Sequence, residues 1–150
     1  ASDFSTIVQG VNSLGQVTGS FFRDDSNGGL VVGSFVFDLT TGTRTEYFQI
    51  NGLQGPRFRD INDSGVITGF VGNQALVGTP GNWQFFPFPT GVSLMTGYGL
   101  NEAGTVVGYY SYPDNTTSGW ISSPVPEPGT WVLMALGLGM VARRASRGAV

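Results

Sequence analysis

The sequence predicts an all-β protein built from repeats, and three observations support this fold class. The 150 residues include 24 Gly and 8 Pro, which indicates many turns. Aromatic and β-branched residues dominate the remainder, while long runs of Ala, Leu, Glu and Lys are missing. A nine-residue pattern also occurs three times. This combination is typical of short strands joined by tight turns.

The repeated pattern is an aliphatic residue, Asn, two variable residues, Gly, one variable residue, a β-branched aliphatic residue, Thr or Val, and Gly. It occupies residues 11–19, 61–69 and 100–108, and an aromatic residue follows each copy. We expect each copy to be the tip of a β-hairpin. The Asn would bond its own backbone two residues on, and the first Gly would supply the positive φ of a type I turn with a bulge. The second Gly would allow a bulge or close strand approach. The predicted turn residues are Asn12, Gly15, Asn62, Gly65, Asn101 and Gly104.

A looser second hairpin follows the first two tips, over residues 34–48 and 74–86. In the third copy, residues 119–121 have no such partner before the prolines begin. We expect the N-terminal segment 4–8 to pair with them and close the array, because a repeat needs neighbours to bury its apolar face. A small propeller-like ring, a trefoil-like array and a sandwich all remain compatible with the pattern.

The tips resemble HAF-type extracellular repeats, in which an Asn-x-x-Gly hairpin precedes a short aromatic strand and a Gly turn. The resemblance covers roughly residues 10–121. The His that names the repeat is absent, with Ser34 or Gln74 near its place. The resemblance implies an extracellular location.

Charge and residue types exclude several functions. The ten acidic residues all precede Val132, together with four arginines, so this part carries a net charge of 4 − 10 = −6. An acidic body of this kind argues against nucleic-acid binding. Without Cys or His, the chain cannot build a thiolate nucleophile, a Cys/His zinc site or a His-based triad. The carboxylates Asp38, Glu46, Asp60 and Glu102 show no spacing typical of a catalytic pair, so we expect no enzyme and no cofactor.

One loop has the residue types of a weak Ca²⁺ site. Asp24, Asp25 and Asn27 offer oxygen ligands, but no bidentate Glu follows at the EF-hand spacing. We favour a solvated turn here.

Aromatic residues are candidates for stacking on sugar rings. Trp83, Phe85, Phe86 and Phe88 lie on one stretch, and a second cluster comprises Tyr109, Tyr110 and Tyr112. We favour a core role for the first stretch, because aromatic strand residues are usually buried.

The C-terminal segment resembles the PEP-CTERM sorting signal. Prolines alternate in its linker, an uncharged run covers residues 131–142, and three arginines follow. The resemblance implies processing by a membrane-embedded exosortase of a Gram-negative bacterium and an association with biofilm or exopolysaccharide. It assigns the sorting box Pro126, Glu127 and Pro128, the cytoplasmic stop Arg143, Arg144 and Arg147, and the membrane or assembly helix Trp131, Val132, Leu133, Met134, Leu136, Leu138, Met140 and Val141.

The length of the apolar run leaves alternatives open. Twelve residues as a helix span roughly 18 Å, which is shorter than the roughly 30 Å hydrocarbon core. A core helix of a soluble domain would fit that length, but it explains neither the Pro-Glu-Pro box nor the missing polar face. We favour the sorting tail. The basic C-terminus supports this interpretation, because basic residues favour the cytoplasmic side of a membrane segment.

The predicted organisation is a β-repeat ectodomain (1–122), a Pro-rich linker with the sorting box (123–130), and a short hydrophobic helix with a basic tail (131–150). A signal peptide removed before Ala1 would explain why the sequence begins with Ala and not Met, and a start chosen within a longer chain would explain it too. The predicted function is a non-catalytic structural protein of the cell surface or biofilm matrix, exported and transiently membrane-anchored. The alternatives are a self-associating subunit of an extracellular filament, with the tail packed in the assembly, and an exopolysaccharide-binding module.

Overall fold

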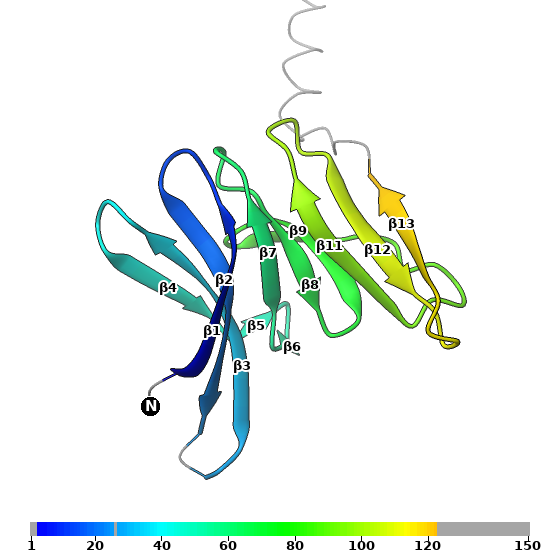
Figure 1. The fold of residues 1–150 in the computed structure, drawn as a ribbon, viewed down its shortest axis with the longest axis horizontal. Coiled ribbons are helices and arrows are strands. Elements are labelled where there is room, and N and C mark those ends of the chain that lie inside the picture. The colour runs from blue at the N-terminus through cyan, green and yellow to red at the C-terminus, as the bar shows by residue number, and fades with distance from the viewer. Residues whose placement is uncertain (1–2, 26, 123–150) are drawn as a thin grey trace, which may run out of the picture.

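The computed structural model describes residues 3–25 and 27–122, and their regular structure consists of thirteen β-strands (Figure 1). All strand pairs are antiparallel. The all-β prediction is therefore confirmed for this part of the chain. The predicted linker and C-terminal helix lie outside the described residues.

Three larger sheets and one small hairpin contain all the strands. Sheet 1 has the order β1 (Asp3–Val11), β2 (Gln16–Asp24), β3 (Leu30–Asp38), β4 (Thr43–Tyr47). Sheet 2 has the order β10 (Asn82–Phe85), β9 (Gln74–Thr79), β8 (Ile67–Val71), β7 (Arg57–Ile61). Sheet 3 has the order β11 (Leu94–Leu100), β12 (Val106–Ser111), β13 (Thr117–Ile121). The small hairpin comprises β5 (Gln49–Ile50) and β6 (Leu53–Gln54).

The three repeat copies form the tips that join the first two strands of each sheet. Gly15, Gly65 and Gly104 have φ values of 78°, 73° and 80°, in the left-handed region that glycine adopts without strain. The looser second hairpins are present as β3–β4 and β9–β10. Both sets of predicted hairpins are confirmed.

A β-bulge precedes every tip by the same distance. The strand register shifts between Val8 and Gly10 in sheet 1, and at the equivalent place, three residues before the tip Asn, in sheets 2 and 3. A bulge bends and twists its strand locally. The second Gly of each repeat pairs across from this bulge, at Gly19, Gly69 and Gly108.

The predicted closure of the array is wrong. β1 pairs with β2 along its whole length, from Asp3 opposite Arg23 to Val11 opposite Val17, and β13 pairs with β12. Each repeat joins the next through a sheet face, so the outer edges of β1 and β13 have no strand partner among the described residues. The three sheets instead stand in an open row, with sheet 1 at one end and sheet 3 at the other (Figure 1).

The sheets stack face against face along this row. We call the face that points toward the sheet-1 end of the row the front face, and the opposite one the rear face. The rear face of sheet 1 packs against the front face of sheet 2, whose core comprises Phe58, Ile61, Ile67 and Leu76. β11 of sheet 3 packs in turn against β7, β8 and β9 of sheet 2. Apolar burial between sheets therefore takes the place of ring closure.

The front face of sheet 1 has no preceding sheet, and charged side chains cover part of it. Arg23 contacts Asp3 and Glu46 at 2.8 Å each, and Arg44 contacts Asp3 at 2.6 Å and Glu46 at 3.1 Å. The Arg44 guanidinium also lies 4.9 Å from the ring centre of Phe35. These charged groups lie over the rings of β2 and β3, whereas Val8 and Val11 of β1 are exposed on the same face.

This charge network predicts a loss of stability in acid. Burial acts to raise the pKa of Asp3, but the hydrogen bonds and charges of Arg44 and Arg23 outweigh it and hold the pKa below its usual 3.8. A carboxylate with a lowered folded-state pKa stabilises the fold above pH 3.8, and this contribution is lost as the pH falls through the lowered pKa. We therefore expect Asp3→Asn to reduce stability at neutral pH and to weaken the pH dependence below about pH 4. Urea unfolding at several pH values measures both effects, and an unchanged pH dependence in the variant would contradict this prediction.

Candidate functional site

The asparagine of each tip closes its own turn with its side chain. The Oδ1 atoms of Asn12, Asn62 and Asn101 accept a hydrogen bond from the backbone N–H four residues later, at 2.8, 2.9 and 2.9 Å. The prediction that the Asn bonds the backbone two residues on is therefore wrong. The turn is longer than expected because the backbone N–H of each Asn also bonds the carbonyl four residues on.

The same asparagines join neighbouring sheets. Asn12 Nδ2 donates to the backbone carbonyl of Asn62 at 2.9 Å, and Asn62 Nδ2 donates to that of Asn101 at 3.2 Å. Asn12 and Asn62 are buried. The three tips thus form one row, which we call the asparagine ladder, with every side-chain bond running in the same direction.

The residue after each Asn forms a second row of bonds. The backbone N–H of Ser13 donates to Asp63 Oδ1 at 2.8 Å, and the Ser13 hydroxyl donates to Asp63 Oδ2. The backbone N–H of Asp63 donates in turn to both carboxylate oxygens of Glu102 at 3.0 Å. The bonds from the Ser13 hydroxyl and N–H hold the pKa of Asp63 below its usual 3.8.

A third carboxylate links sheet 2 to sheet 3 just before the tips. Asp60 Oδ2 accepts the backbone N–H of Leu100 at 2.8 Å. Gly10 occupies the matching position of sheet 1, and a Cβ atom there would lie 2.7 Å from the Asp60 Cα. Asp60, Asp63 and Glu102 thus all bind backbone groups of a neighbouring repeat, which the sequence alone did not indicate.

The ladder predicts different effects for one substitution at two equivalent asparagines. Asn62→Asp keeps the Oδ acceptor for the turn but loses the donor to Asn101 and sets a charge against that carbonyl. We expect it to lower the free energy of unfolding by about 1–3 kcal/mol. Asn101→Asp keeps its turn bond and loses no bond to another sheet within residues 3–25 and 27–122, so we expect a change within about 0.5 kcal/mol. Urea unfolding of the two variants measures the difference, and equal losses would contradict a ladder between sheets.

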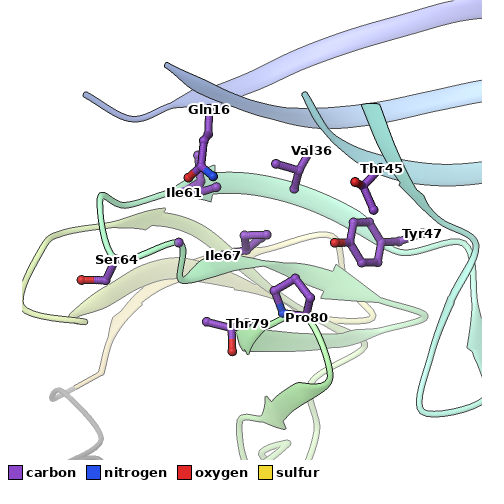
Figure 2. A pocket seen from close by; sticks show the side chains of 10 residues that line it. Gln16, Val36, Thr45, Tyr47, Ile61, Ser64, Ile67, Thr79 and Pro80 are labelled. Carbon is purple, nitrogen blue, oxygen red and sulfur yellow. The ribbon is translucent and has the colours of Figure 1, made fainter. Parts of the chain in front are cut away.

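A cleft of about 370 Å³ opens between sheets 1 and 2 near the tips (Figure 2). Gln16, Thr45 and Tyr47 line it from sheet 1, while Ile67 and Pro80 face them from sheet 2 (Figure 2). Burial raises the pKa of the Tyr47 hydroxyl. The cleft therefore combines an apolar floor with neutral hydrogen-bonding groups and offers no charged side chain to a ligand.

The aromatic stretch has mainly the core role that we favoured. The ring of Trp83 lies 5.3 Å from Phe58 and 6.3 Å from Tyr47, centre to centre, between sheets 1 and 2. Phe85 packs against the same core, whereas Phe88 is 41 % exposed. The ring of Phe86 packs against that of Trp120 in sheet 3, with the ring centres 4.8 Å apart.

The tyrosine cluster is not brought together on one face. Tyr109 and Tyr110 are consecutive in β12, so their side chains point to opposite faces of sheet 3. Tyr110 stacks on Trp120, with ring centres 6.1 Å apart, and Tyr109 lies 6.4 Å from Tyr98. A single sugar-binding patch made of these tyrosines is therefore excluded.

The loop with calcium-type ligands is closed by one of its own carboxylates. Asp25 Oδ1 accepts the backbone N–H of Asn27 at 2.7 Å and that of Gly29 at 2.6 Å. Asp24 lies exposed at the end of β2. No group of three or more acidic, His or Cys side chains suited to a metal ion occurs in the part of the chain that the structure describes.

The sorting box, the apolar run and the terminal arginines all lie outside the described residues. Within residues 3–25 and 27–122, no helix has the length and apolar character needed to cross a membrane. The site that the structure does describe is an array of sheets linked tip to tip.

Comparison with protein families identifies the C-terminal segment. The PEP-CTERM protein-sorting motif matches residues 124–147, which include the predicted box and the apolar run. The chain is therefore a protein exported to the cell surface and sorted by exosortase, as its tail predicted. No curated protein and no solved structure shows significant similarity to the chain. The resemblance of the tips to HAF-type repeats stays a prediction.

Proposed function

We propose that this chain is a non-catalytic structural protein of the surface or biofilm matrix of a Gram-negative bacterium. The observation that carries the proposal is the sorting motif at residues 124–147, because it marks the chain for the cell surface. In this proposal the row of sheets is the part displayed outside the cell, and exosortase cleaves the tail during sorting.

The bonding of the carboxylates supports a structural role. Asp63 and Glu102 bind backbone N–H groups of adjacent tips, and Asp3 and Glu46 are paired with arginines. A general acid or base needs a carboxyl group that can reach a substrate in a pocket. These four groups are instead engaged in holding strands and sheets together.

The experiment tests this proposal by changing the sorting box and following the protein in the producing bacterium. We expect Glu127→Ala to keep the full-length chain in the membrane fraction, whereas the native protein reaches the surface with its tail processed. Asp24→Ala changes an exposed acid outside the motif, so it should be sorted normally. Cell fractionation with intact-mass measurement distinguishes these results. Normal sorting of the Glu127 variant would refute the role given to the box.

The cleft between sheets 1 and 2 favours a second candidate, binding of a neutral carbohydrate. Its volume of about 370 Å³ lies in the range of small-ligand sites, and its polar groups are hydroxyls and amides. Equilibrium dialysis with exopolysaccharide fragments tests this candidate. Tyr47→Phe removes only the hydroxyl and keeps the ring on Phe58 and Trp83, so we expect weaker binding by an intact fold. Absence of saturable binding by the native chain would reject it.

A further inference from the structure

Equivalent repeat positions are buried inside the row of sheets and exposed at its two ends. On rear faces, Thr18 and Thr68 are fully buried, but Val107 in the same repeat position of sheet 3 is 45 % exposed. On front faces, Phe58 of sheet 2 is fully buried, but Val8 in the same position of sheet 1 is 62 % exposed. At these positions the two ends of the row expose apolar side chains, whereas the equivalent positions inside the row are buried.

The asparagine ladder ends in complementary groups. The carbonyls of Asn62 and Asn101 each accept two bonds, one from the Gly three residues on and one from the preceding asparagine side chain. The carbonyl of Asn12 accepts only the bond from Gly15 among the described residues. Asn101 Nδ2 has no acceptor in that part of the chain. Because all ladder bonds run in one direction, the donor of one end matches the acceptor of the other.

The rear face of sheet 3 carries an exposed apolar pair near the tip, with the polar Thr117 farther along the same face. Val107 pairs with Ile121, which is 73 % exposed, and Tyr98 nearby is 54 % exposed. The front face of sheet 1 carries exposed Val8 and Val11 beside the tip. The Arg23, Arg44, Asp3 and Glu46 network lies on the same front face as these valines, over the rings of Phe21 and Phe35. The exposed valines of the edge strand β1 therefore lie beside a charged network, and protein–protein interfaces combine apolar and polar areas of this kind.

We propose that a second copy of this chain docks head to tail, with the rear face of sheet 3 on the front face of sheet 1. The contact continues the interface that sheets 1 and 2, and sheets 2 and 3, already form within one chain. In it, Asn101 Nδ2 of one copy donates to the Asn12 carbonyl of the next, and Val107 packs against Val8. This contact goes beyond the proposed function and does not depend on the sorting route. A heterologous contact generates a ring or a filament, according to the rotation between copies.

The experiment measures the mass of the full-length chain by sedimentation velocity over a range of concentrations. We expect Val107→Glu to block the sheet-3 end and Val8→Glu to block the sheet-1 end, because each places an unpaired carboxylate between the apolar side chains of the contact. Each variant alone should lose self-association by about 30-fold or more in dissociation constant. Leu53→Glu is the matched control, since Leu53 is 43 % exposed in the β5–β6 hairpin, away from both end faces. Near-UV circular dichroism checks that each variant is folded.

A mixture of the two blocked variants gives the decisive result. The Val8→Glu copy keeps its sheet-3 end and the Val107→Glu copy keeps its sheet-1 end, so together they should form a 1:1 dimer and nothing larger. The proposal would be overturned if the native chain stays monomeric up to its solubility limit. This also holds if the reason is that residues 123–150 of the same chain cover sheet 3. Self-association that persists in either single variant would overturn it as well, because it would show a symmetric contact or another surface.

Discussion

Gly69→Ala is expected to lower the free energy of unfolding by about 3 kcal/mol or more. Gly69 lies in β8 opposite Phe58, next to the bulge of β7. A Cβ atom at Gly69 would overlap the carbonyl oxygen of Arg57 and lie 3.0 Å from the Phe58 Cα. Both are backbone atoms, so the clash cannot be relieved by a side-chain rotation. Strands β7 and β8 would have to separate at the point where they support the tip.

The matched control for this prediction is Gly119→Ala. Gly119 lies in β13, and the nearest atom to its Cβ position is the carbonyl oxygen of Gly108 at 3.9 Å, an ordinary contact. Alanine there reduces the freedom of the unfolded chain, so we expect unchanged stability or a gain of up to about 1 kcal/mol. Urea unfolding followed by tryptophan fluorescence measures both variants. Equal effects would mean that the close approach beside the bulge is not present in solution.

The hairpin tips could be predicted from sequence because their signal is local. Asn62 and Gly65 lie within one turn, and Gly69 lies just beyond it on the returning strand. Turn chemistry and the need for a positive φ at Gly65 depend on few residues. The same reasoning applied to each copy, so the three hairpins and their close strand approaches followed from one pattern.

The stacking of the sheets could not be predicted because its contacts are far apart in sequence. The ladder bond from Asn12 joins residues 50 positions apart, and nothing in the pattern distinguishes an Asn that caps a turn from one that also reaches another sheet. Ser13, Asp63 and Glu102 occupy one repeat position but are three different residue types. The repeat pattern therefore gave no signal for the hydrogen bonds that join them. The expected pairing of residues 4–8 with residues 119–121 failed because it assumed that strand edges, rather than sheet faces, join the repeats.

Phe58 illustrates the same limit at the centre of the core. It lies four residues before the tip Asn, where the other two copies have Val8 and Gly97, so the repeat pattern gives no reason to single it out. The structure makes it fully buried, with ring centres 5.2 Å from Tyr47 of sheet 1 and 5.3 Å from Trp83 of sheet 2. Its backbone N–H also donates to Ser34 Oγ at 2.9 Å. One side chain thus connects the two sheets.

Phe58→Ala is expected to lower the free energy of unfolding by about 3–5 kcal/mol, because it removes buried apolar surface, leaves a cavity and breaks two aromatic contacts. Phe4→Ala removes the same atoms from a side chain that is 61 % exposed, with its ring 6.5 Å from Phe22, so we expect a loss of about 1 kcal/mol or less. Both are measured by urea unfolding, with an unchanged m value as the sign that the fold is retained. Because Phe58 contributes mainly to the contact between sheets, the large loss is expected only if sheets 1 and 2 unfold together. A small loss, or two separate unfolding transitions in the native chain, would show that the sheets are independent units and that the row of sheets does not act as one body.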